Sequence, residues 1–208
     1  MRLLLASTSP ARLTVLRGGG IEPIVLAPNA DEEELTAVAL AEGLIKTTQD
    51  MVAFLARAKA DSVIDRPEAA GTLILGCDSS LEFDGESLGK PHDPQVAIER
   101  WRKLRGSSGV LHSGHYLIDN RDPAHRRSVG ATSSAKVYFE NLTDREIEDY
   151  VATGEPLKVA GAFTIDGRGG AFLGGIEGDP HTVIGLSLPT LRKLTGELGL
   201  HYPDFWNL

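Results

Sequence analysis

The chain has 208 residues, a formal net charge of -8 and one cysteine. Its acidic charge argues against a nucleic-acid-binding protein, which needs many cations to hold a phosphate backbone, but not against a site for one small polyanion. A single cysteine excludes an internal disulfide framework. No apolar stretch approaches the roughly 20 residues that span a membrane, and no secretory signal begins the chain, so we expect a cytoplasmic protein without membrane contacts.

The first motif is a short apolar run, Leu3–Ala6, followed at once by the start of a helix. Ser9 is a favourable N-cap and Pro10 suits the first helical position. A strand-to-helix turn directs backbone N–H groups and the positive end of the helix dipole at one spot, where Ser7 and Arg12 add polar groups. This motif is typical of a phosphate site, and an ordinary capped helix with a surface arginine explains it equally well.

The next elements are a short strand at 24–26, four consecutive acids at 31–34 and a helix over about 48–64. Acidic residues favour a helix start, although one or two of the four could instead hold a divalent cation. The periodicity of the helix predicts one apolar face, made of Met51, Phe54, Leu55, Ala58 and Ser62 and broadened by Val52, Ala56 and Val63. Lys59 lies beside this face, where it either extends its ammonium to water or, if the face borders a cleft, meets a phosphate.

An apolar run over 72–77 predicts a strand that is covered on both faces. Asp78 follows this run, and an acid at the carboxyl end of a buried strand is a frequent site of chemistry in α/β proteins. A buried carboxylate needs a partner such as a metal, Lys or Arg, which makes Asp78 the leading functional candidate. We expect Cys77, inside the run, to be a small core residue and not a nucleophile.

Asp84 and Gly85 predict a hairpin whose second arm ends at Lys90 and returns toward Asp78. A helix over 94–104 follows and carries basic residues that we expect to pair with nearby acids. Two antiparallel strands are then predicted over 110–120 and 128–140.

His112 and His115 are three positions apart on the first of these two strands, hence on opposite faces, and so are poor candidates for a shared metal site. A capping box at Thr143 begins a further helix, and the last helix is predicted over 189–198. The glycines between 160 and 175 indicate either tight turns over a ligand or surface hairpins.

Together, these motifs resemble those of the Maf-like nucleoside triphosphate pyrophosphatases, also called septum formation proteins, and they follow one another in the same order as in that family. The matching stretches cover nearly the whole chain: Leu5–Pro10 with Arg12, Asp31-Glu32, Ala58–Ala60, Gly76–Asp78, Gly89–Pro91, Thr153–Pro156, Ala160–Ala162 and Val183–Leu186. The resemblance implies an α/β fold of the Maf/ITPase type, with a mixed central sheet flanked by helices and two lobes around an active-site cleft. It implies a single domain over residues 1–208, and a homodimer.

The resemblance also implies hydrolysis of a nucleoside triphosphate to the monophosphate and pyrophosphate with Mg²⁺ or Mn²⁺. Asp78 would be the general base and a metal ligand, and Glu32 would complete the metal site. The triphosphate would be held by Ser7, Ser9, Arg12, Lys59 and Lys90. Attack of water on phosphorus requires these residue types independently, because a carboxylate must orient the water and cations must take up charge on the leaving group.

Three positions depart from the branches of the family that differ in base preference. Ala11, Ser79 and Asp166 depart from the uridine/thymidine-directed branch, which has Arg, Thr and Gln there, and Ala11 also departs from the aromatic residue typical of the 7-methyl-GTP-directed branch. A general, house-cleaning pyrophosphatase is therefore the main interpretation, with Ser79 and Asp166 near the base, where the acid at 166 could accept hydrogen bonds from exocyclic amino groups. The alternative is a nucleotide-binding regulator of cell division with little turnover.

Overall fold

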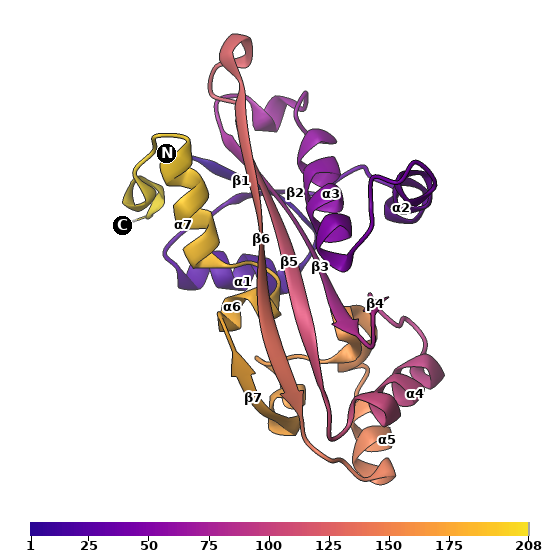
Figure 1. The fold of residues 1–208 in the computed structure, drawn as a ribbon. Coiled ribbons are helices and arrows are strands. Elements are labelled where there is room, and N and C mark those ends of the chain that lie inside the picture. Colours follow the sequence, from indigo (N-terminus) through magenta and orange to yellow (C-terminus); the bar gives the residue numbers. More distant parts are fainter. Residues whose placement is uncertain (208) are drawn as a thin grey trace. The chain divides into compact units, whose positions relative to one another are not determined.

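The computed structural model describes residues 1–207, which form both helices and strands (Figure 1). The chain divides into two compact units. The first contains Met1–Asp78, Ser113–Ser133 and the segment from Gly185 onward, and the second contains Ser79–His112 and Ser134–Ile184. Three long strands pass from one unit into the other: β3 (Leu73–Phe83), β5 (Ser108–Asp119) and β6 (Arg127–Phe139).

The first unit is built on parallel strands. Its remaining elements are β1 (Leu3–Ala6), α1 (Pro10–Gly18), β2 (Ile24–Leu26), α2 (Glu32–Ala41), α3 (Thr48–Asp61) and α7 (Leu188–Glu197). Strand β1 pairs in parallel with β2 on one side and with β3 on the other, Leu5 opposite Val25 and Leu75. All of β1 and the first six residues of β3 are buried, which for β3 confirms the prediction that its apolar run is covered on both faces.

Helix α3 lies directly against the sheet, because glycines on two strands remove the side chains that would separate them. A Cβ atom on Gly76 of β3 would lie 2.1 Å from the carbonyl oxygen of Ala56, and one on Gly114 of β5 would lie 2.2 Å from that of Val52. The buried residues of α3 include Val52, Leu55, Ala56, Lys59 and Ala60. The predicted face was therefore partly wrong: Val52, Leu55, Ala56 and Val63 are buried as predicted, but Lys59 lies within the buried face, and Met51, Phe54, Ala58 and Ser62 are only half-buried.

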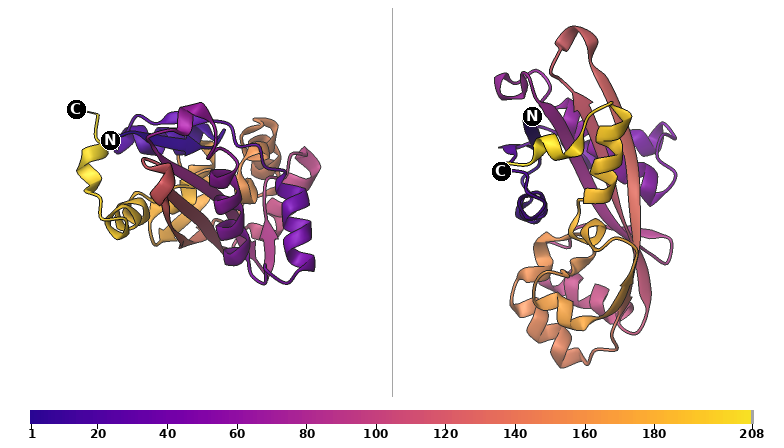
Figure 2. Two further views of the ribbon diagram at one scale, coloured as in Figure 1. Left: turned by 90° about the horizontal axis from the view of Figure 1, so that it is seen from above. Right: turned by 90° about the vertical axis from the view of Figure 1, so that its left-hand side faces the viewer.

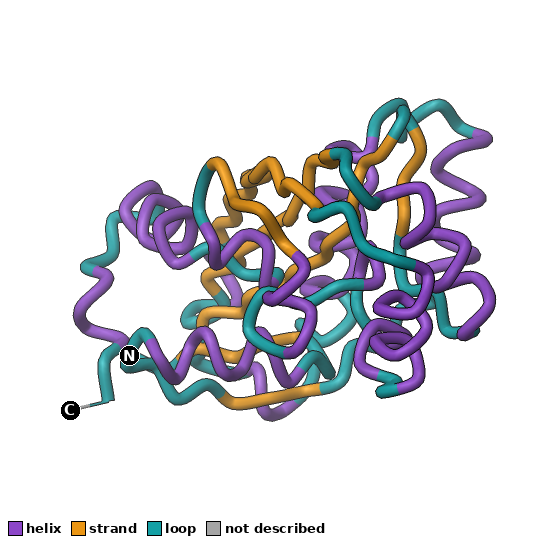
Figure 3. The backbone as a smooth tube through the Cα atoms, turned by 90° about the horizontal axis from the view of Figure 1, so that it is seen from below, coloured by secondary structure: helices purple, strands orange, loops and turns teal. Residues whose placement is uncertain are grey.

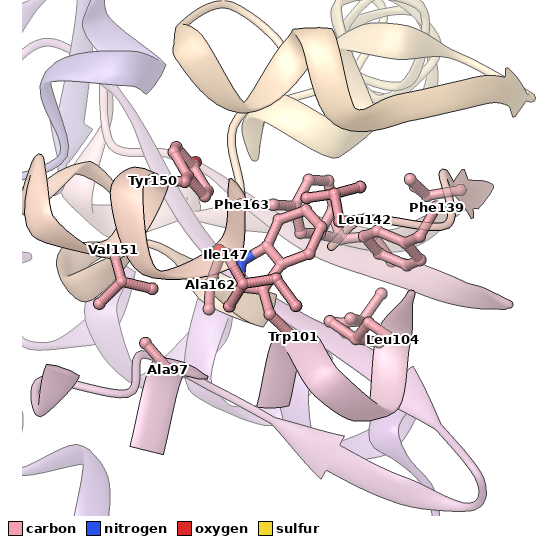
Figure 4. Packing of buried hydrophobic residues seen from close by; sticks show 13 residues of the cluster. Ala97, Trp101, Leu104, Phe139, Leu142, Ile147, Tyr150, Val151, Ala162 and Phe163 are labelled. Atoms are coloured by element: carbon pink, nitrogen blue, oxygen red, sulfur yellow. Dashed lines mark hydrogen bonds between the residues drawn. The ribbon is translucent and has the colours of Figure 1, made fainter. Parts of the chain in front are cut away.

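The second unit is organised around one tryptophan. Its further elements are β4 (Glu86–Leu88), α4 (Pro94–Leu104), α5 (Asp144–Ala152), β7 (Leu173–Glu177) and α6 (Pro180–Ile184). Trp101 of α4 is fully buried, makes edge-to-face contacts with Phe139 and Tyr150, and donates its indole N–H to the Ala162 carbonyl at 2.7 Å (Figure 4). The predicted hairpin is confirmed: β3 pairs antiparallel with β4 around Asp84 and Gly85, both at positive φ.

The central sheet is mixed, since the parallel β1–β2 and β1–β3 pairs coexist with the antiparallel β3–β4 and β6–β7 pairs. Its strand order is β2-β1-β3-β5-β6-β7, with β4 on β3; the helices between the strands can be followed in Figure 3. The predicted mixed α/β fold is thus confirmed, whereas the single domain with a cleft between two lobes stays a prediction.

The two ends of the described chain belong to the first unit, where the C-terminal segment runs beside the N-terminal one (Figure 2). The Met1 ammonium donates to the Asp204 carbonyl at 2.6 Å, and the Asn207 amide donates to the Gly20 carbonyl at 2.8 Å. Within residues 1–207 no helix is long and apolar enough to cross a bilayer.

One strand boundary corrects the sequence prediction. Asp78 does not end β3, which continues to Phe83. The pairing of β3 with β1 does end near it, at the Ala6–Gly76 pair, because β1 stops where the turn to α1 begins. Asp78 therefore lies where the parallel ladder opens, which preserves the physical reason for expecting chemistry there.

We expect Gly76→Ala to lower the free energy of unfolding by about 1–3 kcal/mol, because the new methyl group would meet the backbone of α3 and force the helix from the sheet. Urea unfolding measures the change. Gly196→Ala in α7 is the matched control, since its Cβ would meet nothing within 4 Å, and it should raise stability by up to about 1 kcal/mol. Equal stability of the Gly76→Ala and parent proteins would contradict the close packing of α3.

Candidate active site

The centre of the candidate site is a buried ammonium that contacts two carboxylates. Lys59 of α3 donates from Nζ to Oδ1 of Asp78 on β3 at 2.6 Å, and its Nζ also lies 2.9 Å from Oε1 of Glu32. The side chains of Lys59 and Asp78 are only 6% and 10% exposed, whereas that of Glu32 is 42% exposed. Three residues that the sequence singled out separately are thus brought together, and all three belong to the first unit.

Local structure explains how each of the three reaches this point. Glu32 is the first residue of α2, whose N-cap is Asp31: the Asp31 carboxylate accepts from the amide of Glu34 at 3.0 Å. The capping box of Thr47 and Asp50 fixes the start of α3, three turns before Lys59. Of the four acids at 31–34, Glu32 is thus the one that turns from solvent to a buried cation.

The electrostatics of Asp78 follow from its burial among charges of both signs. Burial raises the pKa of the Asp78 carboxyl, the Lys59 and Arg12 cations oppose this rise, and the Glu32 carboxylate adds to it. The net effect is a raised pKa, since transfer from water disfavours the charged form of the carboxyl. A carboxyl group with a raised pKa is suited to accept a proton from water.

The turn between β1 and α1 forms the second part of the site. Ser7 and Arg12 are both buried, and Arg12 donates from Nη1 to Ser7 Oγ at 3.1 Å. Ser9 occupies the N-cap position as predicted, but its side chain makes no capping hydrogen bond; its amide instead donates to Ser7 Oγ at 3.1 Å. Pro10 occupies the first helical position, and the Ser9 hydroxyl accepts no hydrogen bond from the backbone amides of α1.

The guanidinium of Arg12 is held from a distant part of the chain. Its Nε donates to the Gly185 carbonyl at 2.9 Å, 173 residues away. Arg12 is therefore not the surface arginine of an ordinary capped helix. These contacts favour the phosphate-site interpretation of this motif over the ordinary capped helix, because an oriented cation beside a helix N-terminus is an arrangement that binds anions.

Oxygen ligands for a divalent cation are present in Glu32 and Asp78. Within residues 1–207, no group of three or more His, Cys, Asp or Glu side chains is arranged to hold a metal ion by itself. The two carboxylates nevertheless converge on one cation, the Lys59 ammonium. This donor set fits Mg²⁺ or Mn²⁺, which are commonly bound through one or two carboxylates together with substrate phosphates.

Three predicted site residues belong to the second unit. Ser79 follows Asp78 on β3 and is half-buried, Lys90 is exposed just after β4, and Asp166 is exposed in the segment between α5 and β7. Their participation in one site with Asp78 stays a prediction.

The segment that carries Asp166 is ordered by Glu155, a residue that the sequence placed only within a family motif. The Glu155 carboxylate accepts from Thr164 Oγ1 at 2.5 Å and from Tyr150 Oη at 3.1 Å. It also accepts the amides of Arg168 and Gly169, at 3.1 and 3.0 Å. Burial acts to raise the pKa of Glu155, but these hydrogen bonds outweigh it and lower the pKa, so the group is a stable anion at the centre of the turn.

The glycines of this segment serve the close approach to Glu155. A Cβ on Gly167 would lie 2.8 Å from Glu155 Oε1, and one on Gly169 would lie 2.4 Å from Tyr150 Oη. The glycine-rich stretch is therefore a compact, internally bonded loop, followed by β7 paired with β6. The sequence indicates either tight turns over a ligand or surface hairpins. The structure has the tight turns, and the ligand stays a prediction.

The two histidines of β5 have separate roles, as their spacing predicts. His112 is buried in the second unit, its Nδ1 is 2.7 Å from Ser134 Oγ, and burial lowers its pKa against the effect of Glu82. His115 is buried in the first unit, and its Nε2 accepts the amide of Ser187 at 2.8 Å. The sequence offered no signal for the second contact, because Ser187 is 72 residues away.

A hollow of about 550 Å³ in the first unit is lined by residues of α3, β5 and β6, among them Phe54, Arg57, His115 and Tyr116. None of the predicted substrate- or metal-binding residues lines it. Arg57 lies 5.7 Å from the centre of the Tyr116 ring and pairs with Asp61. It has no part in the site described above.

Comparison with known proteins gives a consistent result. Residues 2–198 match the model of the family described as Maf, Maf-like protein. The chain is 51% identical over its whole length to a nucleoside triphosphate pyrophosphatase of Leifsonia xyli subsp. xyli, of which 97% is covered, and 52% identical to one of Salinispora tropica, of which 88% is covered. A solved dITP/XTP pyrophosphatase from Mycobacterium abscessus covers 95% of this chain, and the chain 94% of it, at 13% identity and a TM-score of 0.38, a likeness too low to bear on the fold.

We expect Cys77 to resist alkylation in the folded protein. It is fully buried, and burial raises the pKa of its thiol to about 11. The reactive thiolate is therefore a very small fraction at neutral pH, and this fraction grows only as the pH approaches 11. Iodoacetamide at pH 7.5 followed by mass spectrometry should show no adduct on the native protein and one adduct after unfolding in urea. Native labelling as fast as in the unfolded chain would contradict a core position for Cys77.

We expect Lys59→Met to lower the free energy of unfolding by about 3–5 kcal/mol near pH 8, because it leaves the Asp78 carboxylate buried without its cation. Lys59 opposes the rise that burial causes in the pKa of Asp78, so removing Lys59 raises that pKa further in the folded variant. The protonated carboxyl then stabilises the folded variant at low pH, and this stability is lost as pH rises. The deficit should therefore be smaller at pH 5 than at pH 8.

Urea unfolding at both pH values measures the deficit of Lys59→Met. Arg57→Met on the same helix is the matched control, since its pair with Asp61 is exposed and should contribute less than about 1 kcal/mol. Deficits of the same size in the two variants would contradict a buried charge cluster at Lys59.

Proposed function

The chain belongs to the Maf-like protein family, and we propose that it is a nucleoside triphosphate pyrophosphatase in which Asp78 is the general base. The reaction is hydrolysis between the α and β phosphates: a water oxygen bonds to the α phosphorus, the bond to the bridging oxygen breaks, and the monophosphate and pyrophosphate are released. The observation that carries this proposal is the contact of the buried Lys59 ammonium with both Asp78 and Glu32.

Asp78 has the properties that a base for water requires. Its carboxyl group is buried, and the net effect of its surroundings raises its pKa above that of a solvated aspartate. Lys59 holds the carboxylate in one orientation through the 2.6 Å hydrogen bond. In the reaction, Asp78 orients the attacking water and takes its proton, while the Lys59 ammonium limits the negative charge that the site presents to a triphosphate.

The triphosphate would bind at the turn between β1 and α1. The Ser7 and Ser9 hydroxyls and the first turn of α1 supply donors, and Arg12 supplies a fixed guanidinium. Charge that develops on the departing pyrophosphate is stabilised by cations and amides that are already oriented. Arg12 and Lys59 would supply two cations to the triphosphate, and Lys90 would add a third.

Glu32 and Asp78 would hold a divalent cation, Mg²⁺ or Mn²⁺, together with phosphate oxygens of the substrate. When bound, such an ion polarises the phosphoryl oxygens and neutralises charge on the leaving group. Ser79 and Asp166 would lie at the base, where Asp166 would accept hydrogen bonds from exocyclic amino groups. We further propose a homodimer, located in the cytoplasm where nucleoside triphosphates are available.

We expect the purified protein to convert nucleoside triphosphates to monophosphates and pyrophosphate when Mg²⁺ or Mn²⁺ is supplied. A panel of the common and modified triphosphates, with products identified by ion-exchange chromatography, measures both the reaction and the base preference. Orthophosphate as the sole product would contradict the pyrophosphatase mechanism, and absence of turnover with retained nucleotide binding would favour the regulatory alternative.

Asp78→Asn is the matched variant for this experiment. It preserves the shape of the side chain but removes the base, so we expect the turnover rate to fall at least 100-fold, with a cooperative unfolding transition retained. Glu82→Gln, a carboxylate-to-amide change on the same strand, is the control and should retain turnover.

A further inference from the structure

The orientation of Arg12 depends on a short segment, Gly185–Ser187, that reaches it from the other end of the sequence. Arg12 is 8% exposed, and its Nε donates to the Gly185 carbonyl at 2.9 Å. Gly185 has a φ of 113°, a conformation that side chains strongly disfavour. No side chain anchors the backbone at Gly185 itself, so contacts of its neighbours determine where this carbonyl points.

His115 supplies such a contact. It lies on β5 and is 1% exposed, and its Nε2 accepts the Ser187 amide at 2.8 Å. A backbone amide only donates, so the Nε2 that receives it carries no proton in this bond. On the other side of Ser187, its Oγ caps α7 by accepting the Thr190 amide at 3.1 Å. Ser187 is thus fixed from two sides, by a strand and by a helix.

The contacts form a continuous path within the first unit. It runs from His115 to the amide of Ser187, across the buried Leu186 to the carbonyl of Gly185, and from there to the guanidinium of Arg12 and to Ser7. Every residue on this path is less than about a tenth exposed or is backbone. Water therefore replaces none of these hydrogen bonds easily if one partner is removed.

We propose that His115 is a positioning residue for the triphosphate: by fixing Ser187, it holds the Gly185 carbonyl that orients Arg12 toward the phosphates. This inference rests on the proposed function, in which Arg12 binds the triphosphate. His115 itself touches no substrate. Its removal should weaken phosphate binding and leave the chemistry at Asp78 intact.

The primary test compares His115→Leu with His115→Gln. Leucine fills the space but accepts no hydrogen bond, whereas the glutamine oxygen can occupy the place of Nε2. The probe is inorganic pyrophosphate with Mg²⁺, measured as a competitive inhibitor of nucleoside triphosphate hydrolysis. We expect its inhibition constant and the KM to rise about three- to tenfold in His115→Leu, with little change in kcat, and to recover in His115→Gln.

A matched control separates positioning from loss of stability. His112→Leu removes the other buried histidine of β5, which contacts Ser134 in the second unit. It should lower the unfolding temperature as His115→Leu does but leave the inhibition constant of pyrophosphate unchanged. Equal changes of that constant in the two leucine variants would overturn the inference, and so would an unchanged constant in His115→Leu.

A double-mutant cycle with Arg12→Met tests the path itself. If His115 acts through Arg12, His115→Leu should have no further effect on pyrophosphate inhibition once Arg12 is methionine. A full additional three- to tenfold loss in the double variant would overturn the inference. If Arg12→Met alone leaves pyrophosphate inhibition unchanged, the phosphate-binding role of Arg12 fails instead, which separates failure of the proposed function from failure of the role of His115.

Discussion

The interaction on which the candidate site depends is the hydrogen-bonded ion pair of Lys59 with Asp78. Two charges that are almost fully removed from water are tolerated because each is the main partner of the other, and because the more exposed Glu32 gives the ammonium a second carboxylate. The pair also requires a fixed distance between a helix and a strand. The glycines of β3 and β5 provide this, since they bring α3 against the sheet with no intervening side chain.

This requirement links the core of the first unit to its chemistry. A buried carboxylate that is held by packing on both sides is available as a base without a prior rearrangement of the protein. The turn from β1 to α1 is held by the hydrogen bonds that Arg12 donates to Ser7 Oγ and to the Gly185 carbonyl. In the proposed function, the general base on β3 and the phosphate-binding cation on α1, the helix that follows β1, are thereby placed near the ends of two neighbouring parallel strands.

Much of this arrangement could be predicted from the sequence, because local signals specify it. Alternating or continuous apolar runs predict the strands, the capping box at Thr143 marks a real helix start, and Asp84-Gly85 is a real hairpin turn. Periodicity failed at α3, where Lys59 is buried: a pattern of apolar residues assigns a lysine to the edge of a helix face, and only the distant carboxylates make its burial favourable.

The contacts of Arg12 and His115, which sequence reasoning missed, join residues far apart in the chain. Nothing near His115 indicates Ser187, and nothing near Arg12 indicates the Gly185 carbonyl, since a backbone group has no sequence signature. The end of β3 was misplaced for a similar reason. The apolar run stops at Cys77, but β3 continues through polar residues because it has partners in β4 and β5. Partner strands, not composition, decide where this strand ends.

The loop around Glu155 has a consequence for binding thermodynamics. Four donors hold its carboxylate, and the glycines leave no room between loop and anion, so the backbone from Thr164 to Gly169 loses its conformational entropy when the protein folds. A ligand that meets Asp166 therefore finds the loop already ordered, and its affinity is not reduced by the cost of ordering it. Such a preorganised surface favours a small heat-capacity change on association and selectivity by shape, in contrast to a loop that folds over its ligand.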